Sequence, residues 1–260
     1  FMKLFDTKII SISNQKGGVG KTTSSVNISS YLAASEIPTL IIDMDPQANS
    51  SSGLGVEIHN DSKSIYDLII KESSPEAVIQ KTSLDYLDII PSSSQLVGAE
   101  IELVSEISRE YLLKEALDKI KGKYKYIIID SPPSLGLLTL NVLTASDSII
   151  IPIQCEYYAL EGLSQLLNTI RLVQKRLNEK LEIEGILVTM YDSRLNLSKQ
   201  VVKELEDYFG DKVYKTYIHR NVRLGEAPSH GKPILLYDAF CVGAQDYMNL
   251  VSEILIKNER

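Results

Sequence analysis

The sequence is poor in cysteine and contains no long apolar run, and each of these absences excludes a class of protein. Its two cysteines, Cys155 and Cys241, are far apart and form no Cys-x-x-Cys pair, so the sequence indicates neither a zinc site nor a disulfide framework. No apolar run approaches the ~20 residues that span a bilayer, and no charged stretch leads into an apolar signal segment at the N-terminus. We therefore expect a cytoplasmic protein with reduced thiols.

An excess of positive charge is also lacking. The formal net charge is -7, which opposes a broadly basic surface for nucleic acid, so that any contact with DNA has to be a local patch.

Apolar residues make up 44% and charged residues 23% of the 260 residues, as is typical of globular proteins. We expect one α/β domain over residues 2–260. Because Phe1 precedes Met2, we expect Phe1 to be a remnant of protein expression.

Apolar runs of strand length alternate along the chain with segments of helical periodicity. The first run, residues 7–13, is rich in isoleucine and alternates little, as strands buried on both faces do. Strands alternating with helices predict a doubly wound, mostly parallel sheet with helices on both faces. Serine and glycine cluster at residues 48–55 and 92–94, which predicts loops. The further predicted strands are residues 39–43, 126–130, 148–153, 185–190 and 213–218.

A phosphate-binding loop follows the first predicted strand. Residues 14–23 read Asn-Gln-Lys-Gly-Gly-Val-Gly-Lys-Thr-Thr and open onto a predicted helix, which is the context that this motif requires. Glycines let backbone N–H groups surround phosphate oxygens, and the helix N-terminus adds its positive end. Lys21 supplies a charge for the outer phosphates and Thr22 a hydroxyl ligand for Mg2+. The motif predicts a P-loop NTPase fold with ATP or ADP and Mg2+ as cofactors, contacted by Lys16, Gly17, Gly18, Val19, Gly20, Lys21, Thr22 and Thr23.

Two residues of this loop depart from the common pattern. Gln15 occupies the position of the first glycine, and Lys16 stands too early for an obvious place beside the phosphates of its own subunit. The stretch Lys-Gly-Gly-x-Gly-Lys-Thr resembles the deviant Walker A motif of the ParA/Soj partitioning ATPases. The resemblance continues through residues 43–47, 130–133, 154–163 and 220–229.

The resemblance implies an activity and an assembly. In the ParA/Soj family, the first lysine of the motif crosses a dimer interface to the partner's nucleotide. We therefore expect an ATP-dependent homodimer that hydrolyses ATP to ADP and phosphate, with catalytic roles for Lys16, Lys21 and Asp45.

Three aspartates end predicted strands at the sheet edge where open α/β folds bind ligands. Asp43 and Asp45 follow the second strand, and Asp130 ends the apolar run 126–130, the Walker B arrangement for Mg2+ held directly or through water. By resemblance, Asp45 is needed for hydrolysis and Asp43 supports the metal region, so the predicted metal set is Thr22, Asp43 and Asp130. A helix cap or turn is the alternative role, and it fits Asp43 and Asp45 better than Asp130.

A late loop carries the predicted base contacts. The family reads adenine with a Pro-Arg-Asn stretch that matches His219-Arg220-Asn221 here, so the resemblance implies that Asn221 hydrogen-bonds the base edge. His219 replaces the proline and is expected to change the shape of that part of the pocket. We expect Pro228 to pack nearby.

Electron transfer and membrane positioning are the two alternatives to partitioning among related ATPases. Electron transfer of the nitrogenase iron-protein kind requires clustered cysteines, which the sequence lacks. A membrane-positioning ATPase similar to MinD requires a C-terminal amphipathic helix with a basic polar face. Residues 243–260 carry an apolar stripe, but the basic residues of their polar face are only Lys257 and Arg260. We expect this helix to dock on the core, without stable membrane association.

Partitioning requires nonspecific binding of double-stranded DNA through basic side chains. The resemblance assigns this role to Arg194 and Arg223. Residues 239–242, Ala-Phe-Cys-Val, stand where the family commonly carries further arginines, so weaker DNA binding is expected. The resemblance also implies a centromere-binding partner of the ParB/Spo0J kind and association with the nucleoid in the ATP state. The sequence does not distinguish a chromosome from a plasmid as the cargo.

Overall fold

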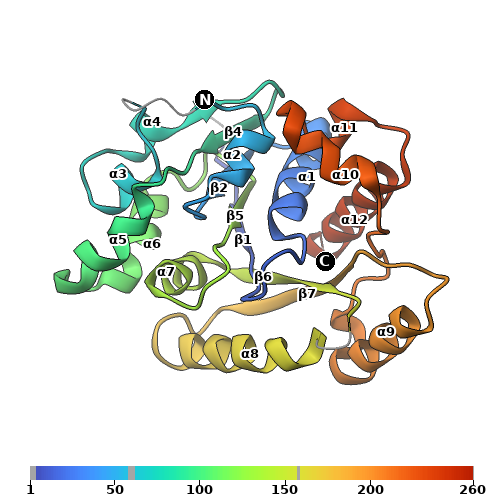
Figure 1. Ribbon diagram of the computed structural model, residues 1–260. Helices are drawn as coiled ribbons and strands as arrows, with labels where there is room; N and C mark the ends of the chain where they lie inside the picture. The colour runs from blue at the N-terminus through green and yellow to red at the C-terminus, as the bar shows by residue number, and fades with distance from the viewer. Residues whose placement is uncertain (1–3, 58–61, 157–158, 260) are drawn as a thin grey trace.

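The structure is a computed structural model that describes residues 4–57, 62–156 and 159–259. Phe1 and residues 157–158 of the family motif lie outside these ranges. In the described chain a seven-stranded sheet lies between layers of helices (Figure 1), with the strand order β3-β4-β2-β5-β1-β6-β7. All neighbouring strands are parallel except β3 and β4. This arrangement confirms the predicted fold class. The strands are β1 (Lys8–Ile12), β2 (Thr39–Asp43), β3 (Gln80–Lys81), β4 (Leu87–Ile90), β5 (Tyr126–Asp130), β6 (Ser148–Gln154) and β7 (Glu182–Thr189).

Helices cover both faces of the sheet. Ile9 of β1 packs in a cluster with the helices α3, α5, α6 and α7, whereas Ile10 and Ile12 pack against α1 and α12. The helices α8 and α9 cover β6 and β7 (Figure 1). Because both faces are buried, the parallel strands appear in the sequence as nearly continuous apolar runs. The helices are α1 (Lys21–Ala34), α2 (Asn49–Gly53), α3 (Ile65–Ile69), α4 (Pro75–Val78), α5 (Leu96–Glu102), η1 (Leu103–Ser105), η2 (Arg109–Tyr111), α6 (Leu112–Asp118), α7 (Leu137–Ala145), α8 (Ala159–Arg176), α9 (Asn196–Phe209), η3 (Gly210–Lys212), α10 (Val222–Glu226), η4 (Ala227–His230), α11 (Ile234–Tyr237) and α12 (Val242–Asn258).

The strand predicted at residues 213–218 is not a strand in the structure. This segment runs beside β7, with one isolated bridge between Val213 and Ile186. In its middle, the backbone N–H groups of Lys215 and Thr216 donate to the Glu253 carboxylate of α12, at 2.9 and 3.1 Å. A side chain of α12 therefore takes hydrogen bonds that a sheet ladder would require.

The loop predicted at residues 48–55 contains the short helix α2, and this prediction was wrong. The serines that suggested turn chemistry bind buried aspartates instead, as described below. Residues 92 and 93 have no regular structure and Ser94 lies in a turn, as predicted. The short strands β3 and β4 were not predicted.

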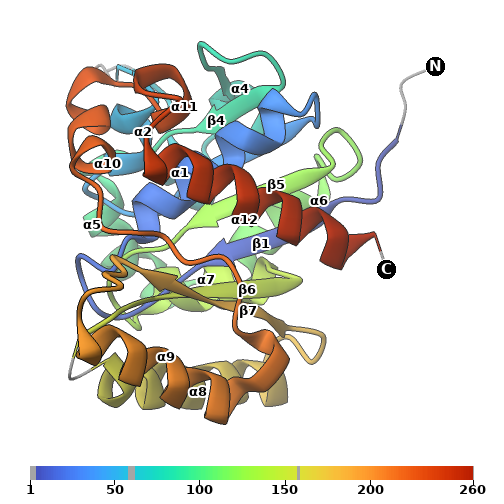
Figure 2. The same ribbon diagram turned by 90° about the vertical axis from the view of Figure 1, so that its right-hand side faces the viewer.

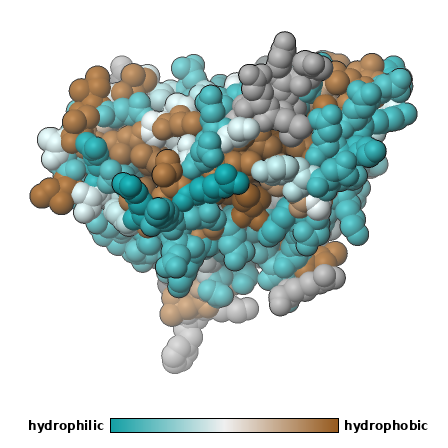
Figure 3. Space-filling model, turned by 90° about the horizontal axis from the view of Figure 1, so that it is seen from below, coloured by the Kyte–Doolittle hydropathy of each residue, from teal (hydrophilic) through white to brown (hydrophobic). Residues whose placement is uncertain are grey.

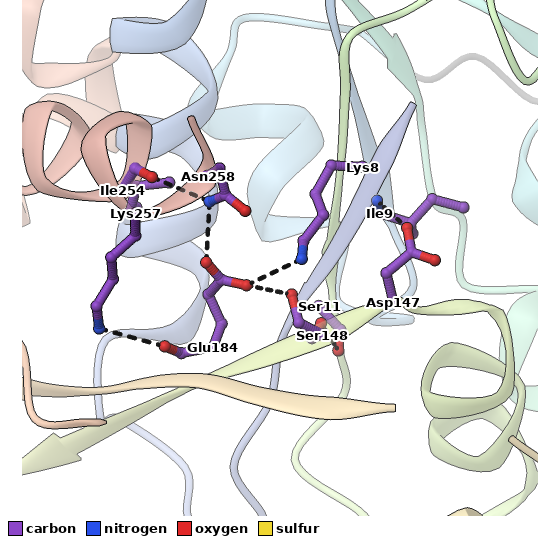
Figure 4. A network of polar contacts seen from close by, with 9 residues as sticks. All are labelled: Lys8, Ile9, Ser11, Asp147, Ser148, Glu184, Ile254, Lys257 and Asn258. Carbon is purple, nitrogen blue, oxygen red and sulfur yellow. Dashed lines mark hydrogen bonds and ion pairs between the residues drawn. The ribbon is translucent and has the colours of Figure 1, made fainter. Parts of the chain in front are cut away.

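A polar cluster at the amino-terminal edge of the sheet holds the end of α12 (Figure 4). The Glu184 carboxylate of β7 accepts hydrogen bonds from Ser148 Oγ at 2.6 Å and from Asn258 Nδ2 at 2.9 Å, and Lys8 Nζ lies 3.4 Å away. Burial would raise the pKa of Glu184, but the Ser148 hydrogen bond and the Lys8 charge hold it below its ordinary value. One carboxylate thus joins β1, β6, β7 and α12.

The C-terminal helix α12 docks on the core, as predicted. It lies along α1 across the sheet (Figure 2) and buries Tyr247, Leu250 and Ile254 completely or nearly so. Among the described residues, no helix is both long and apolar enough to cross a membrane.

One side of the surface carries an apolar stripe. Seen from below, hydrophilic side chains cover much of the surface, and apolar side chains show near its middle and at its left margin, the side on which α5 lies in Figure 1 (Figure 3). Val97, Ile101, Val104 and Ile107 are 61% to 88% exposed and recur every three or four residues from α5 through η1 into the turn that follows.

Candidate nucleotide site

The predicted phosphate loop connects β1 to α1 at the carboxyl edge of the sheet (Figure 1). Gly18 and Gly20 have φ of 73° and 88°, a left-handed conformation that glycine adopts without strain. Asn14 fixes the start of the loop, since its Nδ2 donates to Pro152 O at 2.8 Å and its Oδ1 accepts from Lys16 N at 3.0 Å. Thr189 Oγ1 of β7 donates to Val19 O at 2.8 Å. Contacts from β6 and β7 therefore hold the loop in shape.

Lys21 is the buried lysine of this loop. Its side chain is folded back so that Nζ donates to Lys16 O at 3.0 Å, and the residue is only 6% exposed. Burial lowers the pKa of Lys21, while the charges of Asp130 and Asp45 oppose that change. A partly desolvated ammonium group inside a glycine loop is suited to the outer phosphates of a nucleotide.

Asp130 ends β5 below the loop and is fully buried. Its carboxylate accepts hydrogen bonds from Ser50 Oγ at 2.7 Å and Ser25 Oγ at 3.1 Å. Burial raises the pKa of Asp130, while hydrogen bonds from Ser50, Thr22 and Ser25 oppose the change. The Thr22 hydroxyl thus helps to stabilise the charged form of Asp130, so the two predicted metal ligands lie close to each other.

Asp43 ends β2 beside Asp130, and Asp45 follows two residues later. Asp43 is fully buried, and its Oδ2 accepts from both the backbone N and the Oγ of Ser51, at 2.9 and 2.7 Å. Burial and the nearby Asp130 charge raise the pKa of Asp43. Asp45 is 7% exposed, and its Oδ1 accepts from Gln47 N at 3.0 Å. Asp43 thus also holds α2 in place through Ser51, although the N-cap of that helix is Ala48.

These residues fit a magnesium ion that comes with its nucleotide. Among the described residues, no group of three or more His, Cys, Asp or Glu side chains could hold a metal ion. Mg2+ commonly binds one or two protein oxygens, several waters and substrate phosphates. Thr22 and Asp130 can supply the protein oxygens, with Asp43 placed behind them.

Lys16 forms an ion pair within its own chain. Its Nζ lies 2.6 Å from Glu156 Oε2, which follows β6, and the two side chains are 39% and 48% exposed. The predicted role of Lys16 at a partner's nucleotide is not tested by a single chain.

The predicted base loop borders a cavity that begins at the phosphate loop. The cavity has a volume of 490 Å³ and is lined by Gly20 and Thr23 on one side and by His219 and Asn221 on the other. A neighbouring cavity of 300 Å³ is lined by Thr22 and Pro228. The structure therefore brings both predicted base residues, Asn221 and Pro228, to the phosphate site.

The two arginines predicted to bind DNA are exposed and paired with acids. Arg194 Nε and Nη2 donate to the Asp192 carboxylate at 2.9 and 2.7 Å. These hydrogen bonds lower the pKa of Asp192 to about 2. Arg223 Nη1 lies 2.9 Å from Glu226 Oε2, and its Nε lies 3.6 Å from Asp238 Oδ2. Neither arginine lies at the phosphate loop.

Three serines that bind the aspartates could not be predicted from the sequence: Ser25, Ser50 and Ser51. Ser25 lies one turn into α1, where a mid-helix serine gives no signal by itself. Ser50 and Ser51 belong to the serine cluster that predicted a loop. The Glu156 partner of Lys16 was also missed, because the two lie 140 positions apart.

Comparison with known proteins gives consistent matches. A family described as "AAA domain" matches residues 7–183. The sporulation initiation inhibitor protein Soj of Bacillus subtilis is 60% identical over 247 residues, which cover 95% of this chain and 98% of that protein. The chromosome partitioning protein ParA of Myxococcus xanthus is 52% identical, covering 95% and 88%. A crystal structure named cobyrinic acid a,c-diamide synthase from Mycobacterium smegmatis, with bound ADP and magnesium, has a TM-score of 0.85 at 34% identity, covering 98% and 97%.

Proposed function

The chain belongs to the Soj/ParA family of partitioning ATPases, and we propose that it binds ATP with Mg2+, pairs into a homodimer, binds DNA without sequence preference and is reset by hydrolysis. Chromosome or plasmid partitioning would follow from cycles of these steps, with association with the nucleoid in the ATP state.

The observation that carries the proposal is the constellation around Lys21. Four features lie together at one sheet edge: a preformed glycine loop, a buried lysine, a threonine close to a Walker B aspartate and an adjoining cavity of 490 Å³. Backbone N–H groups and Lys21 would hold the phosphates, and Thr22 with Asp130 would hold the metal ion. The bound magnesium would neutralise charge that develops on the transferred phosphoryl group.

Hydrolysis would depend on Asp45. Its Oδ1 is used by the Gln47 backbone, which leaves Oδ2 as the oxygen to orient an attacking water. Phosphoryl transfer gains mainly from such positioning and from charge stabilisation. Lys16 would leave Glu156 and add its charge at the nucleotide of the partner subunit.

DNA binding would use Arg194 and Arg223, and a centromere-binding protein of the ParB/Spo0J kind would complete the system. An acidic protein has to gather its few cationic contacts to bind DNA, and pairing of two subunits doubles their number.

Amide synthesis, which the name of the Mycobacterium smegmatis protein denotes, is not proposed, because the relatives named for partitioning are more similar in sequence.

Two measurements test the proposal. Calorimetry should detect Mg-ATP binding by the parent and no binding by Lys21→Ala, because the loop loses its buried cation. Fluorescence anisotropy with labelled duplex DNA should show binding that requires ATP and falls steeply with salt. If the parent instead ignores DNA and sediments with anionic liposomes in ATP, a MinD-like function replaces this one.

A further inference from the structure

His219 of the base loop is held by a carboxylate from another part of the chain. Asp246 Oδ2 accepts from the His219 backbone N at 2.9 Å and lies 3.0 Å from the ring Nδ1. A carboxylate only accepts, so the ring donates from a protonated Nδ1. Asp246 belongs to α12 and is 8% exposed. The pair therefore ties the base loop to a helix that is docked on the core.

Asn221 lies two residues after this anchor and borders the same cavity as His219. Its Oδ1 accepts from Arg223 N at 2.9 Å and caps α10. The capping bond directs the side-chain oxygen toward the helix and leaves the Nδ2 amide as the donor for a ring nitrogen of a purine base. The position of Asn221 thus depends on the backbone that His219 fixes on one side and α10 fixes on the other.

Two further contacts make α12 a support for this cavity. Tyr247, next to Asp246, lines the cavity, and its OH lies 3.0 Å from Ser24 Oγ in α1. Near the start of α12, Gly243 lies against Leu224 of α10, so closely that an added Cβ would be 2.7 Å from Leu224 Cγ. The same helix face contacts the helix of the phosphate loop and both ends of the base loop.

We infer that Asp246 is a positioning residue for base recognition, which through His219 holds Asn221 at the base cavity. This inference rests on the proposed binding of an adenine nucleotide. A proline at position 219, as in the family motif, would restrict φ and carry no N–H. Histidine has neither property, and its part-buried N–H needs an acceptor. Asp246 supplies that acceptor and restores by hydrogen bonding the restraint that a proline ring provides covalently.

Binding of two probes, Mg-ATP and magnesium tripolyphosphate, tests the inference by calorimetry on the full chain. Asp246→Ala should weaken ATP binding roughly tenfold, the usual cost of leaving a buried donor unpaired. Its affinity for tripolyphosphate, which lacks a base, should match the parent. Gln245→Ala, at an exposed neighbouring position on α12, is the matched control and should bind both probes like the parent. Asp246→Asn keeps one acceptor oxygen and should lose less ATP affinity than Asp246→Ala. It replaces the alanine variant in the test if that variant does not fold.

The second arm is a rescue. Adding His219→Pro to Asp246→Ala removes the unpaired N–H and should restore most of the ATP affinity. The inference is overturned if the Asp246 variants bind ATP like the parent, if they lose ATP and tripolyphosphate equally, or if the double variant stays as weak as the single one. A parent protein that binds tripolyphosphate but gains nothing from the adenosine group would overturn the proposed function instead.

Discussion

Lys16 Nζ and Glu156 Oε2 lie 2.6 Å apart, so the lysine that marks this family is neutralised within its own subunit. Both side chains are partly exposed, and ion pairs between exposed groups contribute only about 0–1 kcal/mol. Lys16 can therefore exchange Glu156 for a phosphate at little cost. In the proposed dimer, Glu156 would compete with the partner's nucleotide for the same ammonium group.

Removing that competition should favour pairing. We expect Glu156→Gln to form dimers at lower ATP concentrations than the parent, and Lys16→Ala to stay monomeric in ATP. Sedimentation velocity across an ATP titration measures both. Glu179→Gln makes the same charge change at an exposed site and should leave the titration unchanged. A Lys16→Ala protein that dimerises like the parent would refute the role of Lys16.

Asp45→Ala should separate nucleotide binding from turnover. Loss of a water-orienting carboxylate is expected to slow hydrolysis on the order of a hundredfold, while the phosphate loop keeps its contacts and an ATP-bound dimer accumulates. Steady-state phosphate release and sedimentation measure the two effects, and Asp85→Ala at an exposed site is the control. Unchanged phosphate release would exclude Asp45 and direct attention to Asp43.

DNA affinity should rise when an acid that pairs with one of the two arginines is neutralised, and should fall when an arginine itself is replaced by an acid. Arg194 is engaged by Asp192, so Asp192→Asn should free its guanidinium and strengthen DNA binding. Arg223→Glu should weaken binding to all sequences alike, since a phosphate contact carries no base information. Anisotropy titrations in ATP on two unrelated duplexes across a salt series give both results. Equal affinities for the parent and both variants would show that these arginines are ordinary surface residues.

Gly185→Ala should destabilise the fold without touching the nucleotide site. An added Cβ at this β7 position would lie 2.7 Å from Cζ of Tyr214, a ring that is completely buried and cannot turn away. Overpacking of this kind costs about 1–3 kcal/mol, which urea denaturation can measure. Gly225→Ala meets no atom within 4 Å and should leave stability nearly unchanged. A Gly185→Ala protein as stable as the parent would mean that Tyr214 has room to move.

The two thiols should differ in reactivity and in its pH dependence. Burial raises the pKa of Cys155 to about 11, and since the thiolate is the reactive form, its labelling should remain slow at pH 8 and rise with pH. Cys241 is partly exposed and should react first. Timed alkylation with peptide mass mapping resolves the two. Rapid labelling of Cys155 at pH 8 would contradict its burial.

The strands that could be predicted from the sequence are those whose burial on both faces requires an apolar run. The strands β1, β2, β5, β6 and β7 are buried on both faces and could be recognised as apolar runs. The strand β4 was hidden because Asp88 interrupts it, and this acid is satisfied by Lys81 and Tyr124. The apolar segment 213–218 was predicted as a strand but is not one, because the Glu253 carboxylate takes the backbone donors of Lys215 and Thr216.

At the candidate site, the motif residues could be predicted and their partners could not. Local spacing places Lys21 and Thr22 at the start of the helix that follows the loop. Asp130 ends a neighbouring parallel strand, and the carboxyl ends of parallel strands meet at the same sheet edge. Two of the serines that bind the buried aspartates, Ser50 and Ser51, come from α2, whose position depends on the same Asp130 and Asp43. The pairing of His219 with Asp246 joins residues 27 positions apart and leaves no periodic signal in the sequence.

The helix α12 connects the two edges of the sheet. Its first turns touch the base cavity through Asp246 and Tyr247, and its last turn is clamped by Glu184 at the opposite sheet edge. At 1.5 Å per residue, its 17 residues carry a displacement at one end over about 25 Å to the other. We expect a fusion joined directly after Asn258 to disturb the Glu184 contacts of this last turn, so fluorescent tags belong elsewhere on the chain.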